Sequence, residues 1–271
     1  MNLGLNTAIK ALGYSRQSYY KAVRLIEKQK TEEMVIKERV LMIRRDQPKV
    51  GCRKLLDHLK SDFAISIGRD RFIEFMRSSG LLVKRKRNYK RTTNSQHRFK
   101  KYKNIVRDAV LARPNQAWAS DITYLRLRKG FCYLSLITDM YSRKIVGFHV
   151  HHSLCIDGTL KALQRALQQR TKESPLIHHS DRGLQYCAMD YISLLKENNV
   201  QISMTEDCHV YENALAERVN GILKSEFYLD ETLQDIQTAR RMVNQVIDVY
   251  NNKRLHNSLG NKTPEFVHNL N

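Results

Sequence analysis

The sequence predicts an α/β domain built on a mixed five-stranded sheet and preceded by small all-helical modules. Two observations support this fold class. Residues 1–113 contain the capping and helix-ending residues typical of short helices, whereas residues 114–271 contain β-rich runs that alternate with helical segments. The charge changes at the same point: of 47 Lys/Arg and 27 Asp/Glu, residues 1–113 hold 29 and 10, which leaves 18 and 17 for the rest. The first part is therefore strongly basic and the second nearly neutral.

The N-terminal segment, residues 1–30, has the outline of a helix-turn-helix. A short helix is expected at residues 7–12, and Gly13 is suited to end it. Ser15 can then cap a second, basic helix at residues 16–30 by accepting a backbone N–H.

Residues 31–83 predict a second helical module. Helices are expected at residues 31–45, 52–60 and 68–79. In the last of these, apolar side chains form a stripe that leaves Arg69, Arg71 and Arg77 free, and we expect Arg69 and Arg71 to contact DNA. A plain helical bundle with solvated arginines is the alternative for either module taken alone.

A basic linker is predicted at residues 84–113. It is dense in lysine and arginine, with Asp108 as its one acid, and it opens with four consecutive cations that are candidate DNA contacts: Lys84, Arg85, Lys86 and Arg87. The whole chain carries a net charge of +20, which favours a polyanionic partner, and double-stranded DNA is the partner we expect.

Residues 114–230 predict the catalytic core. Strands are expected at 118–125, 131–138, 144–151, 176–180 and 201–204, and helices at 157–169, 188–199, 212–227 and 233–251. This order, three antiparallel strands followed by alternating helix and strand, is typical of a ribonuclease-H-like fold. Residues 231–271 are expected to form a C-terminal helix and tail packed on the core.

Three acids occupy positions where metal-dependent chemistry would need them. Asp121 lies within the first strand, Asp181 at the carboxyl end of the fourth, and Glu217 on a later helix. Each alone is weak evidence, but three hard oxygen ligands suit Mg²⁺ or Mn²⁺. A pair of such ions can activate an attacking oxygen and stabilise a leaving oxygen. The expected chemistry is hydrolysis or transesterification of DNA.

Two neighbouring residues could be mistaken for ligands. Asp139 precedes a turn, where aspartate commonly caps backbone amides, so we interpret it as structural. His179 is interpreted as orienting the Asp181 carboxylate or contacting substrate without binding metal.

Several motifs share one pattern: W-x-x-D-I-T-Y at 118–124, S-R-K-I-V-G at 142–147, H-S-D-R-G-x-Q-Y at 179–186, N-A-x-A-E-R at 213–218 and Y-N-x-x-R-x-H-x-S-L-G-x-x-T-P at 250–264. In addition, 35 residues separate Asp181 from Glu217. With these features the chain resembles the DDE transposase and integrase superfamily, and in particular the second-frame (OrfB) protein of the insertion-sequence-three family.

The resemblance implies a ribonuclease-H-like core, two Mg²⁺ ions for which Mn²⁺ can substitute, and Asp121, Asp181 and Glu217 as their ligands. It also implies DNA binding by residues of about 32–90, an upstream-frame helix-turn-helix partner or fusion, and a homo-oligomer on paired DNA ends.

Further DNA contacts are expected in the core. Lys224 lies seven residues after Glu217 on the same helical face, which favours a phosphate contact. Asn213 shares that face. Arg182, which follows Asp181, could either reach a phosphate or form a simple ion pair. Arg254 and His256 either pack the last helix on the core or touch the transferred strand.

The sequence thus predicts a DDE transposase that nicks an element end and joins the exposed 3′-hydroxyl to a second phosphodiester. A nuclease without strand transfer and an inactive DNA-binding relic are the alternatives. The five cysteines form no C-x-x-C pair and no zinc-finger spacing, so reduced thiols, no structural zinc and a cytoplasmic location, without membrane contact, are expected.

Overall fold

The computed structural model describes residues 5–83, 100–107, 109–170, 174–206 and 213–270. The chain forms two compact units, one made of residues up to 46 together with 50–83, the other of residues 47–49 together with the chain from 84 onward. The predicted cations at 84–87 lie outside the described residues.

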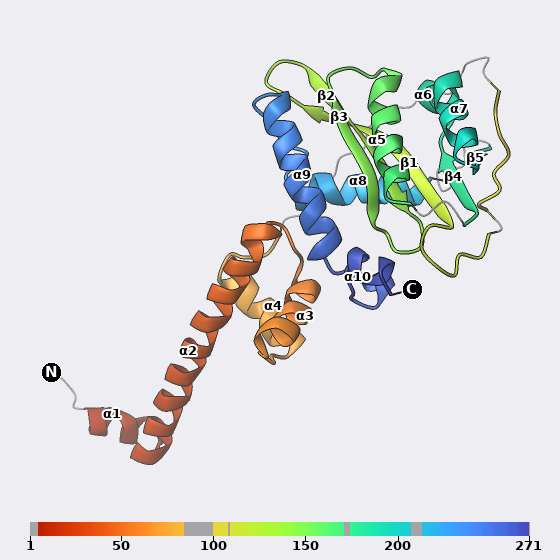
Figure 1. The fold of residues 1–271 in the computed structure, drawn as a ribbon. Coiled ribbons are helices and arrows are strands. Elements are labelled where there is room, and N and C mark those ends of the chain that lie inside the picture. The colour runs from red at the N-terminus through yellow and green to blue at the C-terminus, as the bar shows by residue number, and fades with distance from the viewer. Residues whose placement is uncertain (1–4, 84–99, 108, 171–173, 207–212, 271) are drawn as a thin grey trace. The chain divides into compact units, whose positions relative to one another are not determined.

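The first unit is all-helical, as predicted (Figure 1). Its helices are α1 (Leu5–Ala11), α2 (Arg16–Asp46), α3 (Cys52–Phe63) and α4 (Arg69–Ser78). The predicted cap is present, because the Ser15 Oγ accepts a hydrogen bond from the Ser18 backbone N–H at 3.0 Å. Gly13, between α1 and α2, has a φ of 75°, which explains why glycine ends the first helix.

One helix boundary was predicted wrongly. The sequence favoured separate helices at 16–30 and 31–45, whereas α2 is continuous over 31 residues. Thr31 was expected to start the second helix, but its hydroxyl donates to the Glu27 carbonyl at 3.0 Å. That bond to the preceding turn satisfies Thr31 inside a helix, so nothing interrupts the backbone there.

The second unit contains a mixed five-stranded sheet (Figure 1). Its strands are β1 (Ala117–Arg126), β2 (Phe131–Asp139), β3 (Ile145–His151), β4 (Leu176–Ser180) and β5 (Val200–Met204). The spatial order is β3-β2-β1-β4-β5. Strands β1 to β3 pair antiparallel, while β4 is parallel to both β1 and β5. This is the predicted ribonuclease-H-like sheet.

Helices cover both faces of this sheet (Figure 1). Helices α5 (Ile156–Gln168), α6 (Leu184–Cys187) and α7 (Met189–Glu197) share one apolar core with Trp118 and Ile137. Helices α8 (Ala214–Glu226) and α9 (Ile236–Asn252) share the other with Leu125 and Leu136. Two short elements that the sequence did not predict follow α9: a 3₁₀ turn at Asn257–Leu259 and α10 (Pro264–His268).

Among the described residues, no helix is both long and apolar enough to cross a membrane. The four described cysteines, Cys52, Cys132, Cys155 and Cys187, form no disulfide with one another.

Candidate active site

The Asp121 side chain lies on the face of the sheet that α8 covers. Its partner across the β1–β2 ladder is Leu136, which belongs to the core shared with α8. From α8, the Asn220 Nδ2 donates to Asp121 Oδ2 at 2.8 Å, and the Ile122 backbone N–H donates to Oδ1 at 2.8 Å. The carboxylate is therefore oriented by a helix amide and by its own strand.

Asp181 is placed beside Asp121 by the parallel pairing of β1 and β4. The last register pair is Ser120 with Ser180, and the next residues along the chain are Asp121, still within β1, and Asp181, directly after β4. The Gly183 backbone N–H donates to Asp181 Oδ1 at 3.0 Å. A Cβ at Gly183 would come within 3.0 Å of that oxygen, so the tight turn favours glycine.

Glu217, an exposed residue in the first turn of α8, is the third acid of the cluster and lies close enough to act electrostatically on Asp121. Burial raises the pKa of Asp121 to about 7, with the charge of Asp181 as the next cause and that of Glu217 as a smaller one. Burial and the charge of Asp181 also raise the pKa of Glu217. The charges of these acids thus act on one another, and a bound cation would reduce the repulsion between the carboxylates. Three carboxylates without nitrogen or sulfur donors fit Mg²⁺ or Mn²⁺.

Lys224 lies on α8 close to the same strand. Its Nζ is 4.2 Å from the centre of the Tyr124 ring, a cation–π contact. Burial lowers the pKa of Lys224, and the charges of Asp121 and Asp230 oppose that shift. The ammonium group is therefore held near the carboxylate cluster, and its phosphate contact stays a prediction.

The two asparagines of this region serve the architecture. The Asn213 Nδ2 donates to the Ser120 carbonyl at 3.1 Å, which joins the start of α8 to β1. Asn213 is buried, so the structure gives its expected DNA contact no support. The role of Asn220 was missed, although its helical register with Glu217 placed it on the correct face.

The two histidines of β4 each contact a serine, and the expected role of His179 toward Asp181 or the substrate stays a prediction. The His179 Nδ1 lies 2.9 Å from the Ser203 Oγ on β5, and the His178 Nε2 lies 2.6 Å from the Ser120 Oγ. Both rings are buried, and burial lowers the pKa of His178 to about 3. Arg182 is partly buried next to Asp181, and its phosphate contact remains a prediction.

Arg254 and His256 pack the segment after α9 against the core, which was one of their two expected roles. Arg254, only 4% exposed, forms a two-pronged ion pair with Glu226, with Nε–Oε2 and Nη2–Oε1 distances of 2.8 Å. Its Nη1 also lies 2.8 Å from the buried His256 Nε2. These contacts attach the segment after α9 to the end of α8, and the expected contact with the transferred strand has no support.

This ion pair yields a stability prediction. Arg254→Met should lower the free energy of unfolding by about 3 kcal/mol, because it leaves the Glu226 charge without its guanidinium partner. Chemical denaturation would measure the loss. The double variant Arg254→Met with Glu226→Met is the control and should recover most of it. A single variant as stable as the wild type would contradict the assigned role.

The predicted rival ligand, Asp139, is a turn cap as expected. Its buried carboxylate accepts hydrogen bonds from the backbone N–H of Asn115 at 2.7 Å, of Tyr141 at 3.1 Å and of Ser142 at 2.7 Å. The Ser142 hydroxyl donates a further one at 2.8 Å. These bonds occupy both oxygens, so Asp139 holds the β2–β3 turn.

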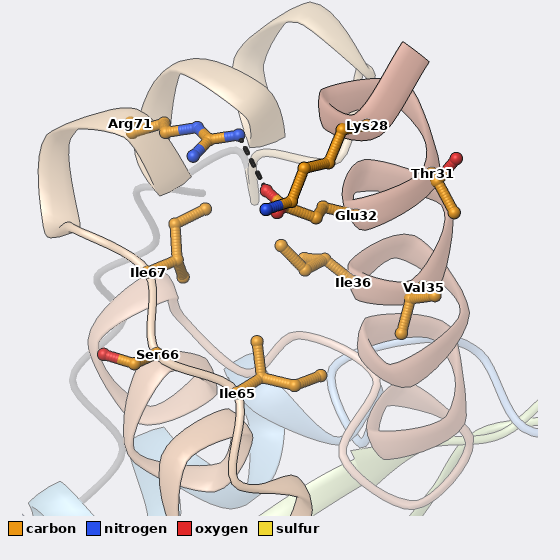
Figure 2. Close-up of a pocket in the computed structure, with 9 residues that line it drawn as sticks. All are labelled: Lys28, Thr31, Glu32, Val35, Ile36, Ile65, Ser66, Ile67 and Arg71. Atoms are coloured by element: carbon orange, nitrogen blue, oxygen red, sulfur yellow. Dashed lines mark hydrogen bonds and ion pairs between the residues drawn. The ribbon is translucent and has the colours of Figure 1, made fainter. Parts of the chain in front are cut away.

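The arginines of α4 were predicted to be free, and this was wrong. Arg71 pairs with Glu32 of α2 at 3.3 Å (Figure 2). Arg69 pairs with Asp70 at 2.9 Å, and Arg77 pairs with Glu74. All three pairs are solvent-exposed and contribute little stability, so a phosphate could replace the acid. Their DNA contacts stay predictions.

Next to Arg71, the helical unit contains a pocket of about 400 Å³ (Figure 2). Figure 2 shows Val35 and Ile36 of α2 opposite Ile65 and Ile67, which precede α4, with Lys28 and the Arg71–Glu32 pair at the rim. None of the three acids of the carboxylate cluster lines it.

The sheet order and the acids on β1, after β4 and on α8 define an integrase-type catalytic core. Two family models, both described as integrase core domain, match residues 112–208 and 198–264. The fold is also found in the simian T-cell lymphotropic virus intasome structure, with a TM-score of 0.52 and 16% identity over 82% of this chain and 72% of that chain. At that identity the likeness concerns the fold alone.

Relatives with higher identity specify the family. Over 260 residues the chain is 33% identical to a 31 kDa protein of insertion element IS600 from Shigella sonnei, covering 94% of this chain and 95% of the relative. Over 229 residues it is 31% identical to transposase InsF of insertion sequence IS3A from Escherichia coli strain K12, covering 84% and 79%. The chain belongs to the IS3 family of insertion-sequence transposases.

Proposed function

We propose that this protein cleaves DNA at the ends of an insertion sequence and joins the resulting 3′-hydroxyl to a second phosphodiester. The observation that carries the proposal is the convergence of Asp121, Asp181 and Glu217, where burial and mutual repulsion raise the pKa of Asp121 to about 7. A structural role does not explain why Asp121 should lie beside two further acids at such a cost to its ionised form.

Asp121, Asp181 and Glu217 would hold two Mg²⁺ ions, which Mn²⁺ can replace. When bound, such ions supply an activated oxygen nucleophile and stabilise the leaving oxygen of an in-line displacement. Oxygen-only donors from a strand, a strand end and a helix support this assignment.

The chain's own groups orient that site. Asn220 fixes one oxygen of Asp121, and the Gly183 N–H fixes one oxygen of Asp181, so both carboxylates keep their orientation before substrate arrives. Lys224 would contact a phosphate of the bound strand, which its place beside Tyr124 and Asp121 supports. In this proposal no side chain forms a covalent intermediate with DNA.

The helical unit and the basic linker would bind double-stranded DNA, since residues 1–113 carry 29 basic and 10 acidic side chains. An upstream-frame helix-turn-helix partner, or a fusion to it, would recognise the element ends. A homo-oligomer would bring two ends together.

The test compares the wild type with Glu217→Gln on a labelled duplex that carries the element's terminal repeat, in Mn²⁺. The wild type should give nicked and strand-joined products, and the variant neither. Glu197→Gln, an exposed acid on α7, is the matched control and should behave as the wild type. Nicks that are never joined would favour the nuclease alternative, and binding without cleavage by the wild type, with the upstream protein added, would favour the inactive relic.

A further inference from the structure

A second group of metal-ligating side chains meets where β3 leads into α5. It consists of His151, the last residue of β3, Cys155, the N-cap of α5, and Asp157, in the first turn of α5. One ligand atom from each residue lies within 4.8 Å of the other two. None of these residues belongs to the carboxylate cluster, and the proposed DNA chemistry does not use them.

The distances in this group suit tetrahedral coordination. The His151 Nδ1 lies 3.3 Å from the Cys155 Sγ, and that sulfur lies 3.2 Å from the Asp157 Oδ2. Around a zinc ion with bonds of about 2.0–2.3 Å, neighbouring ligand atoms are roughly 3.6 Å apart. These two pairs of atoms would therefore need to separate by only a few tenths of an ångström to admit the ion, and the third pair, from His151 and Asp157, lies within 4.8 Å.

The backbone fixes the positions of these ligands. A Cβ at Gly158 would lie 3.0 Å from the His151 Cβ, so the first turn of α5 packs directly against the histidine. In the connecting loop, the Leu154 carbonyl accepts a hydrogen bond from the Gln185 Nε2 at 2.8 Å. The loop that presents Cys155 is thus held at both ends, which lowers the entropy lost when an ion binds.

The three ligands range from buried to exposed, so the site is open to solvent on one side. His151 is 8% exposed, Cys155 is partly buried and Asp157 is exposed. An ion could enter from the Asp157 side, and a water molecule could take the fourth position there. The exposed His152 contacts the His151 ring, with 4.2 Å between the two ring centres, and therefore lies next to the proposed ion site.

We propose that His151, Cys155 and Asp157 form a binding site for one zinc ion, separate from the Mg²⁺ site of the carboxylate cluster. A thiolate and an imidazole favour a borderline-soft ion such as Zn²⁺ over Mg²⁺, which prefers oxygen ligands. The ion would join the end of β3 to the start of α5. Sequence spacing did not predict it, because H-x-x-x-C-x-D is not a zinc-finger pattern.

The experiment is a titration of the EDTA-treated full chain with Co²⁺, a coloured substitute for zinc. Binding should produce a thiolate-to-cobalt charge-transfer band that saturates at one equivalent and disappears when Zn²⁺ is added. Cys155→Ser should abolish the band, and Asp157→Asn should weaken cobalt binding at least about tenfold. Both changes are nearly isosteric at a partly or fully exposed position, so the fold should be retained, which circular dichroism would check.

Two control variants separate this site from others in the chain. Cys52→Ser, which removes a partly buried thiol of the helical unit, should leave the band unchanged. Asp121→Asn should also leave it unchanged, because a site made only of carboxylates gives no sulfur band. The proposal is overturned if the wild type shows no charge-transfer band, or if the band survives in Cys155→Ser. In either case the three side chains form only a hydrogen-bonded cluster.

Discussion

Asp121→Asn should abolish DNA cleavage and joining while making the metal-free protein more stable. The loss of activity follows because the variant removes one of the three carboxylates that would hold the catalytic ions, and we expect a decrease of at least about 10³-fold. The gain in stability follows because the wild-type carboxylate is half-buried near Asp181 and Glu217, and this loss of solvent together with the neighbouring charges raises its pKa from 3.8 to about 7.

The stability effect should depend on pH. Between about pH 4 and pH 7 the folded state holds the Asp121 proton more tightly than the unfolded state does, so the free energy of unfolding of the wild type falls as pH rises through this window. The amide that replaces this carboxylate in the variant does not titrate. The free energy of unfolding of Asp121→Asn should therefore equal that of the wild type at pH 4 and exceed it by roughly 2–4 kcal/mol at pH 8.

Urea denaturation in EDTA at the two pH values would measure this difference. Asp190→Asn, a change at an exposed acid on α7, is the control and should show no such trend. An Asp121→Asn variant that gains nothing at pH 8 would mean that burial and the neighbouring acids do not raise the pKa of Asp121 as the structure indicates. Saturating Mn²⁺ should reduce the difference in stability between Asp121→Asn and the wild type, because only the wild type retains the complete ligand set and is stabilised fully by the metal.

Gly147→Ala should destabilise the second unit by about 3 kcal/mol or more, and a large part of the protein should then be recovered in aggregates. A Cβ at Gly147 would lie 2.4 Å from the Ala162 carbonyl oxygen and 2.7 Å from the Ala166 Cβ. The first of these is a backbone atom of α5, which cannot rotate away, so β3 and α5 would have to separate.

Gly221→Ala is the matched control for this prediction. Gly221 lies in α8, where a Cβ would meet no atom within 4 Å, and alanine has the higher helix propensity. This variant should therefore be stabilised by up to about 1 kcal/mol. Thermal unfolding of the wild type, Gly147→Ala and Gly221→Ala would measure the stability of each. If Gly147→Ala proved as stable as the wild type, the close packing of β3 on α5 would be wrong.

Local patterns predicted the sheet well because β-rich runs and turn residues are properties of short segments. The strand boundaries at 117–126 and 176–180 differ little from those expected. Local patterns failed at Thr31, where a hydroxyl that can cap a helix instead bonded inside one. They also did not predict the two short elements after α9, whose residues show weak periodicity.

Contacts between distant segments could not be read from the sequence. Asn213 bonds to Ser120, 93 residues away, and Asn220 bonds to Asp121, 99 residues away. Which polar side chains orient the acids and which face DNA depends on how α8 packs on β1. For Arg254 and His256 the sequence left two roles open, and only burial and the Glu226 pair decided between them.

The parallel pairing of β1 and β4 also limits how such a chain can change in length. Successive residues of a strand face opposite sides, so inserting one residue between Ala117 and Asp121 would turn the carboxylate toward α5 and α7. Asp181, directly after the neighbouring strand β4, would then no longer face Asp121. Deletions and insertions should therefore be excluded from these two strands, even where substitutions on their surfaces are accepted.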